Sequence, residues 1–407
     1  MNRDPIPAYT VLKECLCCGD SSLIPVLNLG TQPLANLYHH NDTPLEKYPL
    51  GVNLCTLCFH LQQWAAVEPD RMFKHYLYVS GTSKTLRDYF DWFAERVDAN
   101  FPATGEKKVL DIACNDGTQL AAFIKRGWRV WGVDPAENLI AQARATGATV
   151  VCDYWTIPVA ERMREYFDVI VAQNVCAHTS YPLRFLLACR EVMHWDSKLL
   201  IQTSQADMVH NGEFDTIYHE HISFFSLNSM YTLAKRAGLV LEGVEITPVH
   251  GGSYVFRLGY GTPDQSVADR LAEEKAVERY ELDTYREFAK RAQETVVELR
   301  HTLERYKQQG YRLVGFGAAA KGNTLLNFAG ITLDYIVDDN PLKQHLYTPG
   351  INIPIYPPKQ LAEESGPVAL VPLAWNFFDE IRQKVKNMRP TQKDIFVTYF
   401  PSVSTRI

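Results

Sequence analysis

Short apolar segments alternate with helical ones between Lys107 and Tyr260, and this alternation constrains the fold more than any other feature. Strands that alternate with helices form a mostly parallel sheet covered on both faces, so the region predicts a doubly wound α/β domain. Its seven strands are expected at Lys108–Ile112, Arg129–Val133, Thr149–Cys152, Phe167–Ala172, Lys198–Thr203, Val240–Thr247 and Ser253–Gly259. Helices are expected at Ser83–Val97, Thr118–Arg126, Glu137–Thr146, Leu183–His194 and Leu227–Ala237.

A second α/β unit is expected after this domain. Residues 266–309 are rich in Glu, Lys, Arg, Ala and Leu, which favours one or two solvated connecting helices. Beyond them the sequence predicts a strand, a Gly-rich turn, a helix and three more strands, at Tyr311–Gly315, Gly315–Gly322, Asn323–Ala329, Asp334–Val337, Val368–Pro372 and finally Asp394–Thr398. The chain therefore divides into residues 1–75, 76–262 and 263–407.

Five of the nine cysteines fall within the first 58 residues. Four of them form two CxxC pairs, Cys15-x2-Cys18 and Cys55-x2-Cys58, a spacing that places four thiolates within tetrahedral reach of one Zn²⁺. Such a site is structural, because protein ligands fill all four positions. Cys17 could replace a neighbour as ligand, and the alternative to a metal site is a set of ordinary buried thiols. An odd cysteine count argues against a disulfide framework.

The composition of the 407-residue chain fits a globular protein, with 46% hydrophobic and 22% charged residues. The formal charge of −6 disfavours a dedicated nucleic-acid or anionic-membrane binder. No apolar run approaches the roughly 20 residues that span a bilayer, and the first residues do not resemble a secretory signal. The sequence therefore predicts a cytoplasmic protein.

The turn after the first strand of the central domain, Asp111-Ile112-Ala113-Cys114-Asn115-Asp116-Gly117-Thr118, lets a ligand approach the backbone at the carboxyl edge of the sheet. It lacks the GxGxxG spacing of dinucleotide sites. Asp134 ends the next strand, where a carboxylate can accept hydrogen bonds from ribose hydroxyls. The pattern predicts a cofactor that contains a ribose, and the alternative is a purely structural turn.

Tyr218-His219-Glu220-His221 gathers a phenol, two imidazoles and a carboxylate in a loop at this same edge of the sheet. The spacing is not HExxH, so it predicts no helical zinc site. An imidazole there can remove a proton next to a carbonyl, with a carboxylate to orient it and a phenol to donate to the enolate oxygen. Each histidine alone could equally be a structural residue.

These blocks together resemble class I S-adenosylmethionine methyltransferases. Further blocks of the chain are similar, in order, to the sugar C-methyltransferases that act on deoxysugar nucleotides. These blocks are the cysteine pairs, Phe167–His178, Asp215–Phe225, His250–Ser253 and Gly315–Asn323. The resemblance implies a zinc module, a Rossmann-like methyltransferase domain and a C-terminal Rossmann-like α/β domain. Ala113-Cys114 departs from the family, which more often has Gly-Ser there.

The resemblance also implies the activity: methyl transfer from S-adenosylmethionine to C3 of a 4-keto-6-deoxysugar nucleotide, usually linked to thymidine diphosphate. It assigns His221 as the base and Tyr218, Glu220 and His178 as its supports. Cofactor contacts are expected from Asp111, Ala113, Asn115, Asp116, Gly117, Asp134, Asn174, Ser80 and Ser83. Substrate contacts are expected from Lys321, Asn323, His250 and Ser253.

Three alternatives remain at the level of sequence. The first is O- or N-methylation of a sugar, and the second is a nicotinamide-dependent oxidoreductase built on the Gly315–Gly322 turn. That turn, followed by Lys321, could hold a diphosphate, although no ribose-binding acid follows about 20 residues later in the expected frame. The third is a zinc-ribbon binding module without catalysis, which leaves the Tyr218–His221 loop unexplained.

Overall fold

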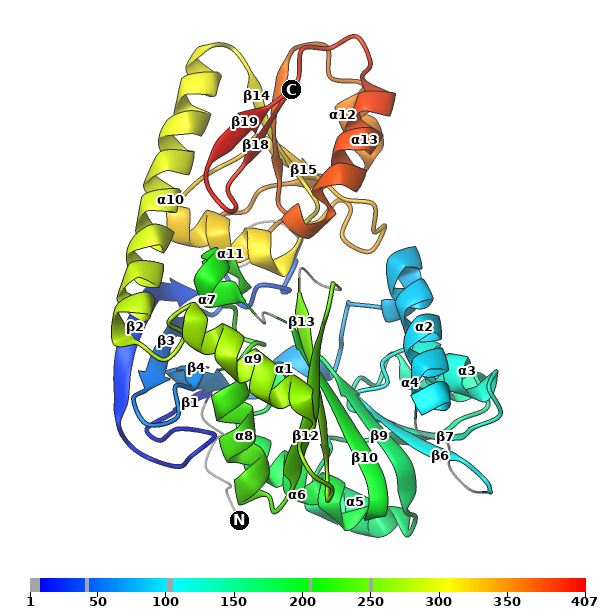
Figure 1. Ribbon diagram of the computed structural model, residues 1–407. Coiled ribbons are helices and arrows are strands. Elements are labelled where there is room, and N and C mark those ends of the chain that lie inside the picture. The colour runs from blue at the N-terminus through cyan, green and yellow to red at the C-terminus, as the bar shows by residue number, and fades with distance from the viewer. Residues whose placement is uncertain (1–7, 41–43, 101–104, 205–206, 249–251) are drawn as a thin grey trace, which may run out of the picture.

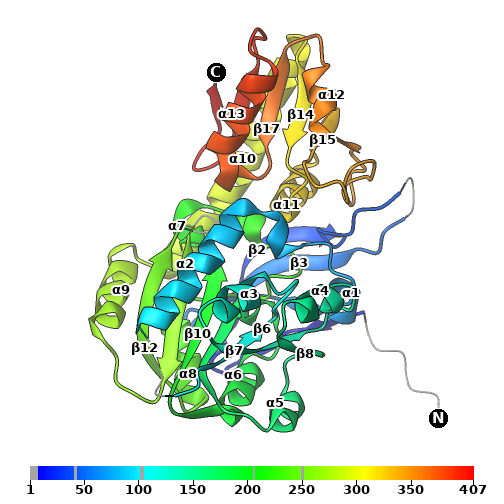
Figure 2. The same ribbon diagram turned by 90° about the vertical axis from the view of Figure 1, so that its right-hand side faces the viewer.

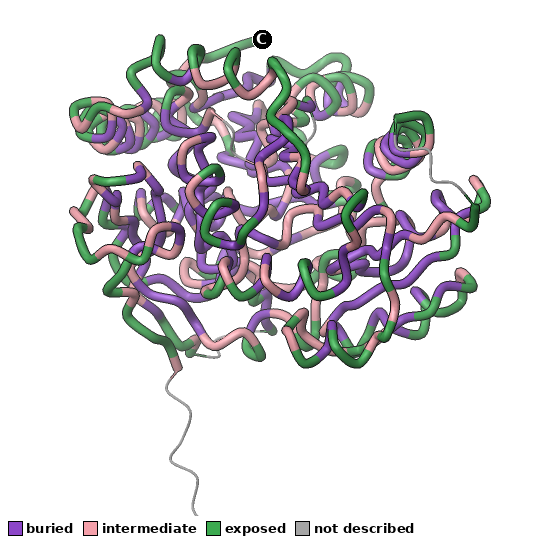
Figure 3. The backbone as a smooth tube through the Cα atoms, turned by 60° about the horizontal axis from the view of Figure 1, so that its bottom comes forward, coloured by how far each residue is buried: buried purple, intermediate pink, exposed green. Residues whose placement is uncertain are grey.

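The computed structural model describes residues 8–40, 44–100, 105–204, 207–248 and 252–407. Three regions of sheet follow one another, and the long helix α10 (Leu282–Gln308) joins the lower part of the molecule to the C-terminal unit at the top (Figure 1, Figure 2). The backbone is buried mainly in the strands, whereas helices expose their outer faces (Figure 3).

The central sheet has the seven strands that the sequence predicted, and their order in the sheet is β12-β13-β10-β9-β6-β7-β8. The strands β6, β7, β8, β9 and β10 are parallel, while β12 and β13 form an antiparallel hairpin at one edge. The bounds of these strands are β6 (Lys108–Ile112), β7 (Arg129–Asp134), β8 (Thr149–Cys152), β9 (Phe167–Gln173), β10 (Met193–Ser204), β12 (Val240–Thr247) and β13 (Ser253–Gly259).

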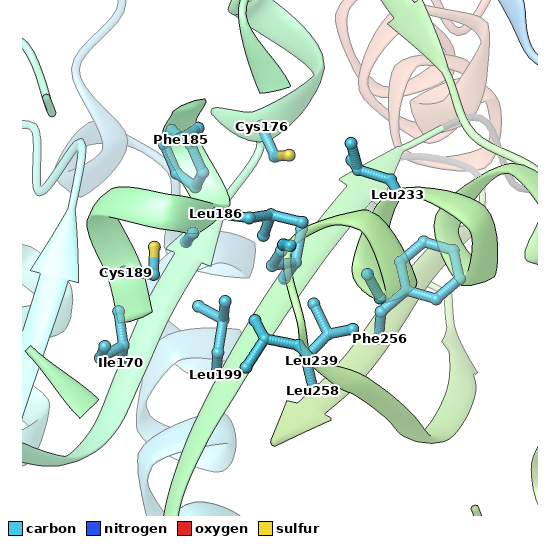
Figure 4. Packing of buried hydrophobic residues seen from close by; sticks show 14 of the residues in the cluster. Ile170, Cys176, Phe185, Leu186, Cys189, Leu199, Leu233, Leu239, Phe256 and Leu258 are labelled. Atoms are coloured by element: carbon cyan, nitrogen blue, oxygen red, sulfur yellow. The ribbon is translucent and has the colours of Figure 1, made fainter. Parts of the chain in front are cut away.

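Helices cover both faces of this sheet because the strands are apolar on both sides. One face packs against α2 (Lys84–Asn100), α3 (Thr118–Ile124) and α4 (Ile140–Ala145). The other packs against α5 (Ile157–Met163), α6 (Pro182–Glu191) and α8 (Leu227–Arg236). Side chains of α6 and α8 interlock there with those of the strands (Figure 4). The carboxyl ends of the parallel strands remain open for the site.

The N-terminal region is a module of strands that were not predicted from the sequence. Between the two cysteine pairs lie β2 (Leu23–Gln32) and most of β3 (Tyr48–Cys55), and β4 (Leu61–Gln63) follows. Their sheet has the order β11-β4-β3-β2, and its edge strand β11 (Ser223–Phe224) comes from the central domain. A separate pair joins β1 (Tyr9–Val11) to β5 (Ala65–Val67). The module is therefore joined to the central domain by backbone hydrogen bonds between β11 and β4.

The C-terminal unit follows α9 (Gln265–Ala276) and α10 and contains a six-stranded sheet in the order β16-β15-β14-β17-β18-β19. These strands span Ile355–Tyr356, Tyr335–Val337, Arg312–Phe316, Val368–Pro372, Ile395–Thr398 and Ser404–Arg406. Helices α11 (Ala320–Ala329), α12 (Pro358–Ala362) and α13 (Phe378–Met388) accompany the sheet. Short helices α1 (Asp70–Phe73) and α7 (Met208–Asn211) lie in loops.

One prediction about this unit was wrong. The strand ending at Thr398 is not the last, because β19 pairs antiparallel with β18. Its residues Ser404–Arg406 are polar and largely exposed, so no apolar pattern marks it. In the described part of the chain, no helix is long and apolar enough to span a bilayer.

Candidate active site

A cavity of about 1320 Å³ opens at the carboxyl ends of β6, β7 and β9. The turn after β6 forms one wall, and the segments around Tyr76 and His178 form another. Of the predicted cofactor residues, the cavity is lined by Ser80, Asp111, Ala113, Asn115, Asp116, Asp134 and Asn174. The structure therefore brings most of these side chains around one space large enough for a nucleoside ligand.

The turn after β6 has an unusual backbone conformation. Ala113, Asn115 and Gly117 have φ values of 63°, 52° and 82°, in the left-handed region that favours glycine. This explains the departure noted at Ala113, because the site tolerates alanine but suits glycine better. A Cβ atom at Gly117 would lie 2.8 Å from Cα of Ala143, so only glycine allows α4 to pack on the turn.

Asp134 holds this turn and faces the cavity. Its Oδ2 accepts the Asn115 N–H at 2.8 Å, and its Oδ1 accepts the Ala136 N–H at 2.8 Å. Asp111 is 3% exposed, and burial together with the neighbouring Asp134 raises its pKa well above the usual value. Burial also raises the pKa of Asp134, although the two N–H donors oppose that shift. The remaining lone pairs of Asp134 suit ribose hydroxyls.

The segment before α2 is fastened to the same turn. Asn115 donates through Nδ2 to the Tyr78 carbonyl and accepts the Ser80 N–H through Oδ1 at 3.0 Å. Asp116 accepts the Gly81 N–H at 2.9 Å and also bonds Thr118 at the start of α3. Ser83 lies outside the cavity wall, where its hydroxyl accepts the Leu86 N–H at 3.4 Å.

The lining of the cavity fits S-adenosylmethionine in its chemistry. Several polar atoms in the wall are buried and have no hydrogen-bond partner among the described residues: Gln119 Nε2, Trp155 Nε1, both amide atoms of Gln173, Asn174 Oδ1 and His178 Nε2. Such atoms cost free energy unless a ligand or water satisfies them. A ligand with ribose, amino and carboxylate groups matches this set of donors and acceptors.

His221 lies in a loop of residues 217–222, called the His221 loop below, beside this cavity. Its Nδ1 is 2.9 Å from the Thr216 carbonyl, and its Nε2 is 2.8 Å from the Tyr218 hydroxyl. A carbonyl oxygen only accepts, so Nδ1 carries the proton and Nε2 presents its lone pair. The orienting partner of His221 is thus a backbone carbonyl rather than the carboxylate of Glu220.

Glu220 precedes His221 in the loop, and His178 lies beside the His221 ring. Glu220 accepts from Asn36 Nδ2 at 2.6 Å and from the Tyr76 hydroxyl at 2.9 Å, and burial raises its pKa. The ring of His178 lies 5.2 Å from that of His221, and burial lowers the pKa of His178 to about 4. His178 lines the cofactor cavity, so it connects that cavity with His221.

The zinc module fixes the backbone of the His221 loop. Gln63 in β4 donates through Nε2 to the carbonyls of Tyr218 and His221, at 2.6 and 2.8 Å. The Gln63 N–H also donates to Ile222 O at 2.8 Å, and Ile222 N–H donates to Ala177 O. The loop is therefore held between the zinc module and the segment after β9.

The predicted substrate residues do not form one group in the structure. Lys321 begins α11 with its ammonium 4.4 Å above the Trp375 ring, and burial lowers its pKa. Asn323 is buried, and its Nδ2 donates to the Ala35 carbonyl and the Tyr38 hydroxyl. Ser253 is buried at the start of β13, opposite Ser204 of β10. His250 lies outside the described residues.

The two units repeat one feature at their Gly-rich turns. Asp338 accepts the Ala318 N–H at 2.6 Å and the Asn340 N–H at 2.7 Å, much as Asp134 does in the central domain. However, Lys343 Nζ and the Tyr38 hydroxyl both donate to the Ala318 carbonyl and crowd this second turn. A nicotinamide dinucleotide has poor access there.

The four paired cysteines come together as the spacing predicted. The Sγ atoms of Cys15, Cys18, Cys55 and Cys58 all lie within 4.8 Å of one another. Cys15 and Cys58 are 3.4 Å apart and Cys18 and Cys55 3.5 Å, close to the roughly 3.8 Å edge of a ZnS₄ tetrahedron. Cys17 is buried but outside this group, so it replaces neither neighbour.

Sequence reasoning assigned no role to Asn36, Gln63 or Asp215, although each bonds to the His221 loop or lies beside it. Asn36 and Gln63 belong to the zinc module, far from the loop in sequence. No spacing rule connects them to it. Asp215 falls inside the block that resembles the family, and only its contacts with the C-terminal unit distinguish it.

Comparisons with known proteins agree with this arrangement. Family models match residues 84–244 as a methyltransferase domain, residues 248–401 as a C-methyltransferase C-terminal domain, and residues 15–73 as a provisionally assigned zinc binding domain. The C-methyltransferase NovU of Streptomyces niveus is 32% identical over 384 residues, which cover 91% of each chain.

The chain belongs to the S-adenosylmethionine-dependent C-methyltransferase family.

Other relatives match the central domain in part. The ubiquinone biosynthesis O-methyltransferase of Histophilus somni is 33% identical over 109 residues, or 24% of this chain and 45% of that protein. A solved magnesium protoporphyrin IX methyltransferase from Synechocystis shares 12% identity over 42% of this chain and 78% of its own, with a TM-score of 0.32. Full-length family membership therefore rests on NovU and the domain matches.

Family membership confirms several predictions. The protein is a methyltransferase enzyme with a Rossmann-like central domain, and its cofactors are S-adenosylmethionine and zinc. Cys15, Cys18, Cys55 and Cys58 form a cluster that could hold the zinc ion. The family assignment also excludes two alternative hypotheses for the whole chain, the nicotinamide-dependent oxidoreductase and the non-catalytic zinc module.

Proposed function

We propose that the protein methylates C3 of a nucleotide-linked 4-keto-6-deoxysugar, of the thymidine diphosphate type, in deoxysugar or secondary-metabolite biosynthesis. The observation that carries this proposal is the fixed tautomer of His221. Its Nδ1 proton is held by the Thr216 carbonyl, and its Nε2 lone pair lies in the loop beside the cofactor cavity. A neutral imidazole so oriented is a base, which carbon methylation needs.

The ketone at C4 acidifies the C3 hydrogen. His221 Nε2 takes this proton, and the C–H electron pair becomes the enolate of C3, C4 and the carbonyl oxygen. The positive charge that forms on the imidazole is stabilised by the bond from Nδ1–H to Thr216. S-adenosylmethionine, when bound in the cavity, would supply the electrophilic methyl group to C3 and would leave as S-adenosylhomocysteine.

Tyr218 changes partner during this step. In the structure its hydroxyl donates to His221 Nε2, so it must turn away before Nε2 accepts the C3 proton. The released hydroxyl can then donate to the developing enolate oxygen. Glu220 holds the Tyr76 hydroxyl at the same wall, and His178 stays neutral because burial lowers its pKa to about 4.

The cofactor occupies the 1320 Å³ cavity in this proposal. Asp134 binds the ribose hydroxyls, and Asn174 and the turn from Asp111 to Gly117 hold the rest of the molecule. Ser80 contributes from the facing segment, and its N–H is already fixed by Asn115. Ser83 contributes indirectly, because its hydroxyl accepts a hydrogen bond from the first turn of α2.

The C-terminal unit, residues 263–407, helps to hold the sugar nucleotide in this proposal, with residues 1–75 and 76–262 as the other two domains. Lys321 offers a positive charge at the N-terminal end of α11, where the helix dipole also favours a diphosphate. Asn323 has only Oδ1 left for a ligand, because Nδ2 is bonded to Ala35 and Tyr38. Ser253 and His250 complete the proposed set.

A panel of nucleotide keto-sugars, each incubated with methyl donor labelled at the methyl carbon, tests the proposal. Mass spectrometry reports whether one methyl group is added, and carbon NMR reports whether it is bonded to carbon, oxygen or nitrogen. A labelled methyl on C3 of a 4-keto-6-deoxysugar is the expected result. A methyl on oxygen or nitrogen with every substrate overturns the proposal in favour of the O- or N-methyltransferase alternative.

A further inference from the structure

The turn that precedes the His221 loop is embedded in the C-terminal unit. This turn is the short 3-10 helix Phe214–Thr216, and its three residues are fully buried. The Phe214 ring packs against Phe328 of α11 and against Phe400, with ring centroids 5.8 Å apart in each pair. The segment thus leaves the central domain, enters the other unit and returns to the loop.

Asp215 forms the polar part of this anchor. Its Oδ2 accepts the Trp375 Nε1–H at 2.9 Å and the Tyr399 hydroxyl at 3.2 Å, and both donors belong to the C-terminal unit. Its Oδ1 is buried and has no hydrogen-bond partner among the described residues. Burial raises the pKa of Asp215 to about 7, while Lys321 and the two donors oppose that shift, so a carboxylate at this position costs folding free energy.

Thr216, the next residue, supplies the carbonyl that fixes the tautomer of His221. Its hydroxyl and N–H both donate to the Glu213 carbonyl, which closes the turn on its N-terminal side. The Ile217 N–H shares a peptide plane with the Thr216 carbonyl and donates to the Phe214 carbonyl at 3.1 Å. The turn that Asp215 anchors therefore fixes the direction of the Thr216 carbonyl, and that carbonyl orients the imidazole.

We propose that Asp215 is a positioning residue, which links the seating of the C-terminal unit to the orientation of His221 through the Thr216 carbonyl. The inference rests on the proposed role of His221 as base. Asp215 lies too deep to reach the sugar itself, and Lys321, which interacts electrostatically with Asp215, is the nearby group placed to sense the diphosphate. Binding of the nucleotide and alignment of the base are then coupled through one buried carboxylate.

The test compares Asp215→Ala, Asp215→Asn and Phe328→Leu with the wild-type chain. Alanine removes both accepted hydrogen bonds, whereas asparagine keeps an oxygen that can accept the Trp375 N–H. Phe328→Leu loosens the apolar packing of the same turn and leaves its polar anchor intact. Each variant is assayed for kcat, KM, thermal stability and the exchange of the C3 hydrogen with deuterated water in the presence of S-adenosylhomocysteine.

We expect Asp215→Ala to lower kcat and the exchange rate by about 100-fold, with KM within about two-fold of wild type. Asp215→Asn should restore exchange to within about ten-fold of wild type. Phe328→Leu should lower thermal stability while exchange stays near wild type. If Asp215→Ala behaves like Phe328→Leu, losing stability but not exchange, the positioning role is wrong. If His221→Ala still exchanges the C3 hydrogen, the base assignment fails instead, whatever the Asp215 variants show.

Discussion

Gln63, in β4 just after the second cysteine pair of the zinc module, donates a 2.6 Å hydrogen bond to the carbonyl of Tyr218. The two residues are 155 positions apart, and the bond joins the zinc module directly to the loop that carries the proposed base. The module therefore supports the active site in addition to holding its four-cysteine cluster.

Gln63→Leu should disable this support. It leaves the carbonyls of Tyr218 and His221 without their buried donor, which costs about 1–3 kcal/mol of folding free energy. We expect methyl transfer to fall by at least about ten-fold, because the loop can then shift. Gln32→Leu is the matched control, since Gln32 is also buried in the module and its side chain donates to the nearby Leu29 carbonyl. Equal activity losses in the two variants would contradict the account.

Zinc removal should affect stability and the loop together. Chelation, or Cys18→Ser, leaves thiols buried around an empty centre, and we expect the melting temperature to fall by more than about 10 °C. Cys17→Ser should retain about one zinc ion per chain, because Cys17 lies outside the four-sulfur group. Metal analysis and thermal unfolding measure both effects. Loss of zinc on replacing Cys17 would show that the ligand set is wrong.

Cofactor affinity should distinguish Asp134 from Ser83. Asp134→Ala removes the carboxylate that faces the cavity, and we expect S-adenosylhomocysteine to bind about 100-fold more weakly. Ser83→Ala removes a hydroxyl bonded to the start of α2, which should cost about 1 kcal/mol of stability and leave affinity within about two-fold. Calorimetric titration measures both. A large affinity loss for Ser83→Ala would favour direct contact, as the family resemblance implies.

Much of the fold could be predicted from the sequence, and the reason is physical. Strands such as Lys108–Ile112 and Val368–Pro372 are buried on both faces, so their apolar runs mark them clearly. Strand Ser404–Arg406 could not be predicted, because it is polar and largely exposed and takes its place by pairing with β18. The same limit applies to β11, whose two residues pair across the domain boundary.

The candidate site, like the fold, contains some features that the sequence predicts and others that it does not. Asp134 and the cysteine pairs were predictable because their spacing is local to one turn or knuckle. The bond between Asn36 and Glu220 joins residues 184 positions apart, and no local pattern encodes it. The partner of His221 was predicted to be a carboxylate, whereas a backbone carbonyl takes that role. Backbone acceptors leave no trace in residue identity.

Stability should depend on pH through His219. This side chain is 1% exposed, and burial lowers its pKa from about 6.5 to about 4. The unfolded chain therefore binds a proton in this range that the folded chain does not, so the stabilisation declines as pH falls below about 6.5. The denaturant midpoint of unfolding should fall between pH 7 and pH 5.5, and we expect it to fall less in His219→Gln than in wild type when both are measured with zinc in excess. The exposed His301→Gln is the control and should keep the wild-type dependence.

Deuterium exchange at C3 tests the central claim most directly. The protein, S-adenosylhomocysteine and a thymidine diphosphate 4-keto-6-deoxysugar are incubated in deuterated water, and proton NMR follows the C3 signal. No methyl group can be transferred, so the signal reports proton removal alone. The account predicts that wild type erases the C3 signal, that Tyr218→Phe does so more slowly, and that His221→Ala leaves it at the uncatalysed rate. Exchange by His221→Ala at the wild-type rate would contradict it.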